Sequence, residues 1–319
     1  MKKIIVLLVL AAMAVAVKAQ QIAVVSSSGS TTMCQTLADA ISKAGNNSVI
    51  YLPAGGFQIS DDVKITRKVT ILGVTHKANS DNAEGNTIIS GNLFFDSGSD
   101  NSAVMGCYIS GSVYIGNDGN AVNNVLIKYC NLGSVQVKNN QCSNTKINQN
   151  YIRGGSYFSG ASATIKNNVM HSVAEMVGGE ISYNIITSCY QYYTLQYIHN
   201  STITRNVIME GRSSYIHNGS NCQVSYNMLI AKEWGDDCYK LESWDGVFEK
   251  NLGVTPASVY KFIGDYAEYN SKVGLYAGGT DFSDGCLPPV PYISVKRIDE
   301  QTDASGNLNV TLRVKSVAE

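Results

Sequence analysis

The residues of this chain best suited to chemistry are concentrated at 232–245, in the stretch KEWGDDCYKLESWD. Its carboxylates are Glu233, Asp236, Asp237, Glu242 and Asp245. Pairs of carboxylates hydrolyse glycosidic bonds and acidic oxygens bind calcium, although the spacing here is not that of an EF-hand loop. Trp234 and Trp244, the only tryptophans of the chain, offer flat rings for stacking against sugars. The stretch therefore predicts a functional loop, or else a loop whose tryptophans pack on the solenoid.

A short phrase, aliphatic-x-x-Asn-x-aliphatic, recurs through the chain. It reads TKINQNYIRG at 145–154, ATIKNNVMHS at 163–172 and STITRNVIME at 201–210. The asparagines of the phrase are Asn150, Asn168, Asn184, Asn206, Asn227 and Asn251. They are separated by 18, 16, 22, 21 and 24 residues. A period of about 20 residues indicates a solenoid in which each repeat forms one coil.

The composition of the repeats selects the type of solenoid. β-Branched residues with Asn and Gly breaks predict short strands, and the repeat is too short for paired helices. The Leu pattern of leucine-rich repeats is absent. The sequence therefore predicts an all-β fold, a right-handed parallel β-helix whose coils stack about 4.8 Å apart.

The recurring Asn is expected at a bend between two strands of each coil, where it also tolerates left-handed backbone. Its amide can donate to one neighbour and accept from another, so stacked copies form a ladder of side chains. Extending the register backwards places Cys107 and Cys130 in the same column, with Gly91 as a candidate for an earlier position. We expect most of the eight cysteines to be buried thiols, and a disulfide between stacked neighbours stays open.

Counting onward from the ladder Asn gives a register for the outer surface. Between three and seven residues after it lie Arg153, His171, Glu175, Glu210, Arg212 and Glu233. If the coils stack in this register, these side chains form one outer strip that could receive a sugar chain. The alternative is a solvated face on which opposite charges are mixed.

Two further features suit contact with sugar or metal. The tetrapeptide YIHN occurs twice, which predicts His199 and His217 one above the other, as an acid–base or metal-binding pair or as a structural column. Tyr192 and Tyr193 end the aromatic run YQYY, which suits stacking against sugars.

The first 19 residues have the features of a secretory signal peptide. Lys2 and Lys3 precede an apolar stretch that is too short to span a bilayer comfortably, and we expect cleavage after Ala19. No later segment is a transmembrane candidate. Without Lys2, Lys3 and Lys18, 21 Lys and Arg remain against 25 Asp and Glu, a net charge of −4. Nucleic acid is therefore excluded as a partner, because a phosphate backbone needs clustered cations.

Both ends of a solenoid need covering, because an open coil exposes apolar core and unpaired strand edges. Residues 35–44 (QTLADAISKA) have apolar residues at helical spacing and predict a short N-terminal capping helix. After Asn251 the pattern decays, and the prolines of 287–291 precede two alternating segments that predict a C-terminal β-hairpin. The expected division is a signal peptide at 1–19, the β-helix with its N-terminal cap at 20–285, and a hairpin or cap at 286–319.

The capping helix, followed by VIYLPAGGFQI, VTILGV and the Asn-bearing coils, resembles the pectate-lyase-like superfamily of right-handed parallel β-helices. The tail, VGLYAGG followed by LPPVPYI and a hairpin, is similar to the ends of such proteins. The resemblance covers roughly residues 35–319 and is greatest to exported members from Gram-negative bacteria. It implies the fold, secretion to the periplasm, cell surface or medium of such a bacterium, and a polysaccharide ligand, because most known superfamily activities concern polysaccharides.

The superfamily's catalytic residues are not carried over, because no position matches the polygalacturonase Asp cluster or the calcium and arginine motif of pectate lyases. The leading expectation is a secreted protein that binds polysaccharide, or that cleaves it as a lyase or glycoside hydrolase. The alternative is a non-catalytic surface or structural solenoid that engages a protein partner, for instance through the hairpin edge. Calcium stays open as a cofactor, but no motif specifies it.

Overall fold

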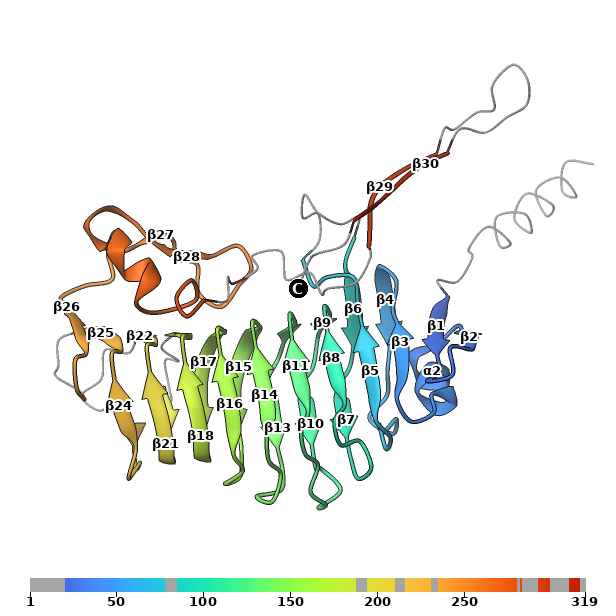
Figure 1. The fold of residues 1–319 in the computed structure, drawn as a ribbon, viewed down its shortest axis with the longest axis horizontal. Coiled ribbons are helices and arrows are strands. Elements are labelled where there is room, and N and C mark those ends of the chain that lie inside the picture. Colours follow the sequence, from blue (N-terminus) through green and yellow to red (C-terminus); the bar gives the residue numbers. More distant parts are fainter. Residues whose placement is uncertain are drawn as a thin grey trace, which may run out of the picture.

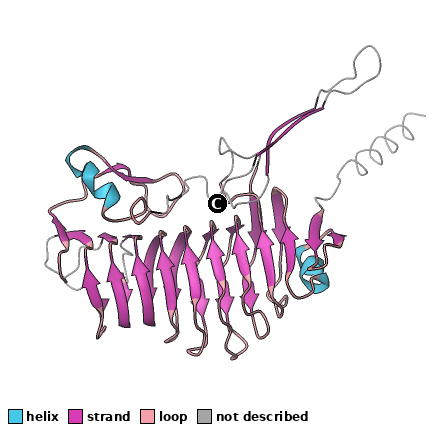
Figure 2. Ribbon diagram, viewed as in Figure 1, coloured by secondary structure: helices cyan, strands magenta, loops and turns pink. Residues whose placement is uncertain are grey.

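The computed structural model describes residues 21–77, 85–187, 194–209, 216–230, 235–279 and 282, together with the backbone of two strands at 292–298 and 310–315. It confirms an all-β fold, a parallel β-helix whose coils stack along one long axis (Figure 1 and Figure 2). The coils wind in the right-handed sense from the blue N-terminal end to the orange C-terminal end (Figure 1). The expected signal peptide lies outside the described residues. No helix in the described part is long and apolar enough to cross a membrane.

Each complete coil contributes to three faces. Face one, turned to the viewer in Figure 1, contains β2 (Thr31–Cys34), β1 (Ile22–Val25), β3 (Ser48–Tyr51), β5 (Val69–Leu72), β8 (Ala103–Met105), β11 (Leu126–Lys128), β14 (Thr145–Asn148), β16 (Ala163–Lys166), β18 (Val177–Ser182), β21 (His199–Thr204) and β24 (Gln223–Ser225). Face two contains β4 (Gly55–Gln58), β6 (Thr87–Ser90), β9 (Tyr108–Ile109), β12 (Asn131–Leu132), β15 (Tyr151–Tyr157), β17 (Val169–Ala174), β19 (Ile185–Thr187), β22 (Val207–Met209), β25 (Met228–Ile230) and β26 (Tyr239–Leu241). Face three contains the C-terminal halves of β15 and β17 with β7 (Leu93–Phe95), β10 (Val113–Ile115), β13 (Val135–Val137), β20 (Leu195–Gln196) and β23 (Ile216–His217).

The aliphatic residue three positions before the ladder Asn points into the core, as predicted. Ile127, Ile147, Ile165, Ile181 and Ile203 lie in direct register on β11, β14, β16, β18 and β21. All five are fully buried. Like side chains therefore stack on like, and the core is one continuous apolar column along the axis.

The predicted amide ladder forms at the first corner, between face one and face two. Asn206 Oδ1 accepts hydrogen bonds from the backbone N of Asn184 at 3.0 Å and from its Nδ2 at 2.9 Å. Asn184 Oδ1 accepts the same pair from Asn168, at 2.9 and 3.0 Å. Asn150 and Asn227 extend the series in both directions. All five amides are fully buried, so each needs these partners to offset the loss of water.

Cysteines occupy the ends of this column. The backbone N of Cys130 donates to Asn150 Oδ1 at 2.9 Å, and Cys107 lies one coil further towards the N-terminus. At the other end Cys238 takes the place after Asn227 in the column, because Met228 pairs with Tyr239. The six described cysteines are free thiols, and burial raises the pKa of Cys130 to about 12. Cys189 and Cys286 lie outside the described residues.

The prediction that Asn251 continues the ladder is wrong. Cys238 follows Asn227 by only 11 residues, and the described residues of this last coil pair with β24 on face one and β25 on face two. Asn251 is exposed, and its Oδ1 accepts hydrogen bonds from Gly253 N at 3.2 Å and Tyr260 Oη at 3.0 Å. The amide therefore closes a local turn outside the coils.

The left-handed backbone at the first corner belongs to the residue before each ladder Asn, not to the Asn itself. Tyr129, Gln149, Asn167, Tyr183, Arg205 and Tyr226 have φ between 52° and 57°. Five of the six precede a ladder Asn, and Tyr129 precedes Cys130 in the same column. The sequence pattern did not distinguish the two positions.

Gly91 does not belong to the ladder either, contrary to prediction. It begins a glycine column at the second corner, in which Gly111 N donates to Gly91 O at 3.1 Å and Gly133 N to Gly111 O at 2.8 Å. A Cβ on Gly111 would lie 2.6 Å from Gly91 O, and one on Gly133 would lie 2.7 Å from Gly111 O. The close passage of successive coils therefore requires glycine here.

The N-terminal cap matches its prediction with slightly different bounds. The helix α2 (Leu37–Lys43) begins at Thr36, whose Oγ1 accepts from Asp39 N at 3.1 Å. Leu37, Ala40 and Ile41 point into the end of the core. The antiparallel strand β1 pairs with both β2 and β3, so it also covers the first edge of face one.

After β26 the chain returns along face two as an arm, residues 242–279 and 282, which contains β27 (Phe248–Lys250), β28 (Val259–Phe262) and the 3-10 helix η1 (Gly264–Ser271). Figure 1 shows it in orange above the solenoid. It buries the outward residue after each ladder Asn, namely Tyr151, Val169, Ile185, Val207 and Met228. Leu275 O accepts from Asn167 Nδ2 at 2.9 Å, and Gly274 N donates to Arg205 O at 2.9 Å. Each covered aliphatic side chain contributes about 1.5–3 kcal/mol.

The predicted C-terminal hairpin is present. Its strands β29 (Tyr292–Ile298) and β30 (Val310–Lys315) pair with each other in antiparallel register. In Figure 1 the pair projects away from the coils.

The ladder predicts the effect of Asn184→Ala. The substitution leaves the buried N–H groups of Asn168 and the carbonyl of Ile165 with fewer partners, and each buried unpaired group costs about 1–3 kcal/mol. We expect the free energy of unfolding in urea to fall by about 3 kcal/mol or more. Asn140→Ala, at an exposed turn, is the matched control and is expected to change it by less than about 0.5 kcal/mol. Equal losses in the two variants would contradict a stabilising ladder.

Candidate functional site

The outer surface of face three presents one side chain per coil in direct register. From the N-terminal to the C-terminal end, this face-three row is Phe94, Tyr114, Gln136, Tyr157, Ala174, Gln196 and His217. The flanking residues of the same strands, such as Val113 and Ile115, are fully buried, so alternation along the strand turns the row outward. Stacking of parallel strands places neighbouring members about 4.8 Å apart.

The N-terminal half of the face-three row is packed on itself. The rings of Phe94 and Tyr114 are stacked, with centroids 4.8 Å apart and planes at 10°. Lys64 Nζ lies 3.4 Å from the Phe94 centroid, and Lys138 Nζ lies 5.7 Å from the Tyr114 centroid. Lys138 Nζ also donates to Gln136 Oε1 at 3.1 Å. The ring faces are occupied by neighbours, so this half is a packed stack and not an open platform.

The C-terminal half of the row is open. Tyr157 is 36% exposed, and the small residue Ala174, which is buried, separates it from the half-buried Gln196 on the coil after that. Within the described residues, neither the Tyr157 hydroxyl nor the Gln196 amide has a hydrogen-bond partner. An aromatic ring, a small residue and an unused amide therefore follow one another along the axis.

The third corner adds side chains beside this open half. Glu175, Tyr197 and Asn218 follow the row on successive coils, with φ of 58°, 52° and 53°. The ring of Tyr197, which is 40% exposed, meets His217 edge-on at 6.1 Å. Asn218 Nδ2 lies 3.1 Å from His217 Nε2, so the amide can donate to this ring nitrogen. We call Tyr157, Ala174, Gln196, Tyr197 and His217 the open site.

Of the strip predicted from the ladder register, Arg153 is committed to structural contacts. Its guanidinium stacks on Tyr108 at 4.5 Å and donates to Asn131 Oδ1 at 3.2 Å. It also donates to the carbonyls of Ile109 at 2.8 Å and Ser110 at 3.0 Å. Arg153 thus ties its own coil to the two preceding coils.

His171 and Glu175 do not join Arg153. His171 Nδ1 pairs with Thr187 Oγ1 at 2.8 Å on the following coil, and burial lowers the pKa of its imidazole. The Arg153 guanidinium reaches the other way along the axis, so roughly 10 Å or more separates the two groups. Glu175 lies at the third corner, beside the open site. The three described members of the strip therefore occupy different places.

The remaining strip and stacking candidates lie outside the described residues. They are Glu210, Arg212, Glu233, Trp234, Tyr192 and Tyr193. Their segments connect β19 to β20, β22 to β23, and β25 to Gly235.

The described part of 232–245 does not assemble a carboxylate cluster. Asp236 and Asp237 are exposed at the last coil. The backbone of Asp236 forms an isolated β-bridge with Ser225, and Asp237 has a φ of 52°. Trp244 is half-buried, stacked on Phe248 at 5.8 Å with planes at 13°. Its face therefore packs within the arm and not on the coils of the solenoid.

The two YIHN tetrapeptides are not in register, so the predicted stacking of His199 on His217 is wrong. The coil length here is 21 residues, which places Gln196 on His217 and His199 on Ser220. His199 begins β21 on face one and pairs through Nδ1 with Ser220 Oγ at 2.8 Å. The repeated letters fall on different faces.

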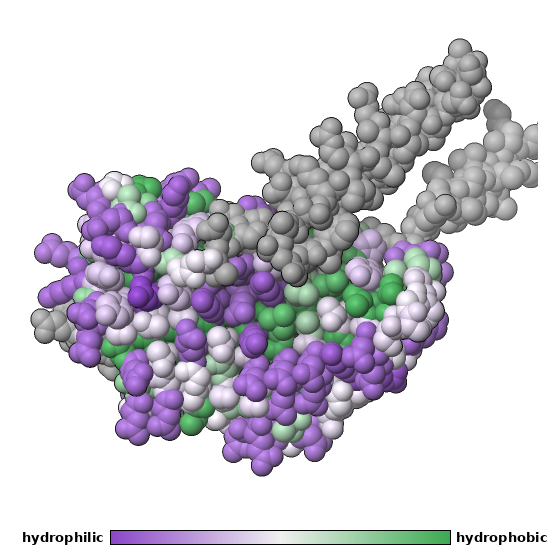
Figure 3. Space-filling view, viewed as in Figure 1, coloured by the Kyte–Doolittle hydropathy of each residue, from purple (hydrophilic) through white to green (hydrophobic). Residues whose placement is uncertain are grey.

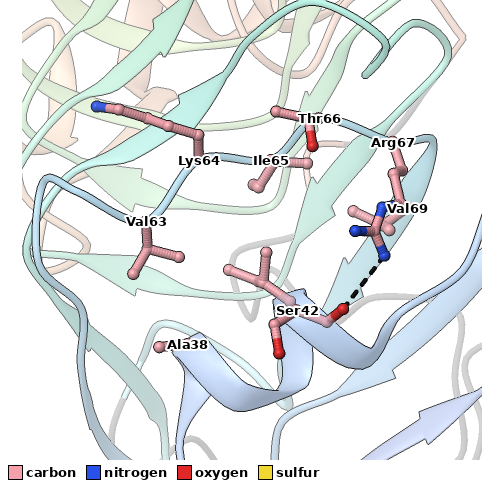
Figure 4. A pocket seen from close by; sticks show the side chains of 9 residues that line it. Ala38, Ser42, Val63, Lys64, Ile65, Thr66, Arg67 and Val69 are labelled. Atoms are coloured by element: carbon pink, nitrogen blue, oxygen red, sulfur yellow. Dashed lines mark hydrogen bonds between the residues drawn. The ribbon is translucent and has the colours of Figure 1, made fainter.

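A cavity of about 310 Å³ lies between the capping helix and residues 63–69 (Figure 4). Ile41, Ile65 and Val69 give it an apolar floor. Arg67 at its rim donates to the helix-end carbonyls of Ser42 at 3.2 Å and Ala44 at 2.7 Å. These contacts hold the capping helix against the first coils. No reactive group points into the cavity.

His76 is a buried histidine in the connection between β5 and β6. It is 3% exposed, and neither ring nitrogen has a hydrogen-bond partner. Its ring meets Tyr151 edge-on at 5.5 Å. Burial lowers the pKa of the imidazole to about 3, so the ring is neutral at physiological pH.

The described residues contain no group of three His, Cys, Asp or Glu side chains that could hold a metal ion. Comparison of the chain with protein-family models, curated proteins and solved structures finds no match. The site therefore has to be judged on its own geometry.

Sequence reasoning missed Tyr157, Ala174 and Gln196. The signal was a second alternating triplet in each coil, such as VYI at 113–115 and VQV at 135–137, whose middle residue points outward. The loop between this triplet and the Asn phrase differs in length from coil to coil. Counting from the ladder therefore loses register before it reaches face three.

Burial of His76 predicts a loss of stability in acid. The folded pKa of about 3 lies below the ordinary value of 6.5, so the unfolded chain binds the proton more readily. This contribution is complete above pH 6.5 and is lost as the pH falls from 6.5 towards 3, by up to about 1.4 kcal/mol per pH unit. His76→Phe is expected to flatten this part of the profile, measured by urea unfolding at several pH values. His199→Phe, at the surface, serves as the control, and parallel profiles for wild type and His76→Phe would refute the assignment.

Proposed function

We propose that the protein binds a polysaccharide along the open site, with the glycan running parallel to the solenoid axis. The observation that carries the proposal is the sequence Tyr157, Ala174, Gln196 and His217, one residue per coil, with an unused hydroxyl and an unused amide. The spacing of about 4.8 Å is close to the length of one pyranose unit in an extended glycan.

The chemistry of these side chains suits sugars. Tyr157 and Tyr197 offer ring surface for the C–H face of a pyranose, and their hydroxyls remain available for hydrogen bonds. The Gln196 amide can donate to one hydroxyl and accept from another. The rigid coils hold these groups in place before binding, which lowers the entropy lost on association.

Resemblance to a known superfamily supports the same proposal. The coil architecture, the corner asparagines and the capping helix are features that resemble the pectate-lyase-like superfamily, whose members mostly act on polysaccharides. Export through a cleaved signal peptide would bring the protein to the periplasm, the cell surface or the medium of a Gram-negative bacterium, where such glycans occur.

Binding without cleavage is the form of the proposal that the described residues favour. A glycosidase needs two carboxylates about 5–10 Å apart, and Glu175 is the one carboxylate that the described residues place beside the open site. A structural solenoid that engages a protein partner is the competing reading, and the projecting hairpin would supply its edge.

The open site predicts the effect of two substitutions on glycan binding. Tyr157→Ala removes a stacking surface and Gln196→Ala removes a hydrogen-bonding amide, so we expect each to weaken affinity about fivefold to tenfold. The measurement is a glycan array with purified mature protein, followed by titration of the best ligand. Unsaturated products absorbing in the ultraviolet, or new reducing ends, would identify a lyase or a hydrolase instead of a binder.

Tyr51→Ala provides the control for exposed tyrosine. Tyr51 is 40% exposed, as is Tyr197, but it lies on face one. Affinity should fall for Tyr197→Ala and stay unchanged for Tyr51→Ala. No binding to any acidic or neutral glycan, with or without calcium, would count against the proposal and in favour of a protein partner.

A further inference from the structure

The outer side of face one is apolar over its N-terminal strands. Met33, Tyr51 and Met105 lie in one outward row, with Val49 and Leu126 in the neighbouring row, and we call these five residues the apolar patch. Leu72 belongs to the same row but is buried. Met33 is 49% exposed and Tyr51 is 40% exposed. Figure 3 shows apolar side chains gathered over β3, β5 and β8. From β2 to β11 the patch extends for about 24 Å.

The protein treats its two apolar outer surfaces differently. On face two the arm covers the outward residues, so that Val169, Ile185 and Val207 are fully buried. On face one Met33 and Tyr51 are exposed, and Val49, Met105 and Leu126 are half-buried. An apolar surface left open beside one that is covered indicates an external partner.

Lysines border the patch at its C-terminal side. Lys128 follows Met105 in the same row, Lys146 follows Leu126, and Lys166 lies two coils beyond Lys128. In the part of the chain that the structure describes, no carboxylate lies within ion-pair distance of these three ammonium groups. Lys128 Nζ and Lys166 Nζ rest over the rings of Tyr129 and Tyr183, at 4.5 and 4.9 Å. We call the three residues the lysine band.

The charge pattern distinguishes between occupants. From β2 to β16 the outward rows of face one contain no Asp or Glu, and the first carboxylate is Glu180 of β18. A second copy packed on the same patch would bring the lysine band against strands without an acidic residue. An occupant with an apolar part next to an anionic part would pack against the apolar patch and pair with the lysine band at the same time.

We propose that the apolar patch and the lysine band together dock the protein on an anionic lipid surface. The patch would lie against the boundary of the acyl chains, and the lysines would lie against the phosphate groups of the lipid heads. Face three is a different face of the solenoid, so the open site stays free when face one is docked. The lipid contact is independent of glycan binding.

Co-sedimentation with vesicles tests the docking surface. Purified mature protein is expected to partition onto vesicles of equal parts phosphatidylglycerol and phosphatidylcholine at least tenfold more strongly than onto phosphatidylcholine alone. Lys128→Gln, Lys146→Gln and Lys166→Gln combined should lower partitioning about tenfold or more, because each lysine near an anionic surface adds to binding. Met33→Ser with Tyr51→Ser should lower it several-fold without changing the charge.

A matched triple substitution controls for net charge. Lys240, Lys250 and Lys261 are exposed and lie outside face one, so Lys240→Gln, Lys250→Gln and Lys261→Gln should leave partitioning within about twofold of wild type. Urea unfolding confirms that each variant is folded. Equal losses from the two triple variants, or no preference for phosphatidylglycerol, would overturn the proposal. A dimer in light scattering that Met33→Ser with Tyr51→Ser dissociates would overturn it in favour of a second copy.

Discussion

The fully buried amide ladder at the first corner is the interaction on which the rest of the structure depends. From Asn168 to Asn227 each Oδ1 accepts two hydrogen bonds from the preceding rung. An Asn such as Asn184 can therefore be satisfied only when the neighbouring coils are in one register. Because side-chain direction alternates along a strand, a slip of one residue would turn the whole apolar column outward. The ladder therefore fixes, coil by coil, which residues form the core and which form the surface.

The three faces use this fixed register for different purposes. Face two places an apolar residue directly after each Asn, and the chain covers these residues with its own arm, anchored at Asn167 and Arg205. Face three presents a row that is closed by ring stacking at one end and open at Tyr157 and Gln196. The outer surface of face one changes from apolar to basic between Met105 and Lys128. A single scaffold thereby separates internal packing from two external surfaces.

The predictions from sequence held where the repeat is regular and failed where the coil length changes. Asn168 and Asn206 fall in the ladder because their coils carry the complete phrase with its aliphatic partners. Asn251 carries similar letters, yet the preceding coil closes after 11 residues and Cys238 takes the rung. A thiol stands at the column's end in place of an amide, and no one-dimensional pattern of asparagines could indicate that exchange.

By itself the sequence determined the coil. An aliphatic residue recurs three positions before each Asn, and only a repeated coil buries every such side chain and also pairs every amide. It also determined the helix at the N-terminal end through the spacing of Leu37 and Ile41. Only the tertiary structure decided the surfaces. Residues such as Tyr157 and Gln196 become neighbours because coils of unequal length stack, and Val207 is buried because the arm returns along face two. Those contacts join residues distant in the chain, and local spacing holds no information about them.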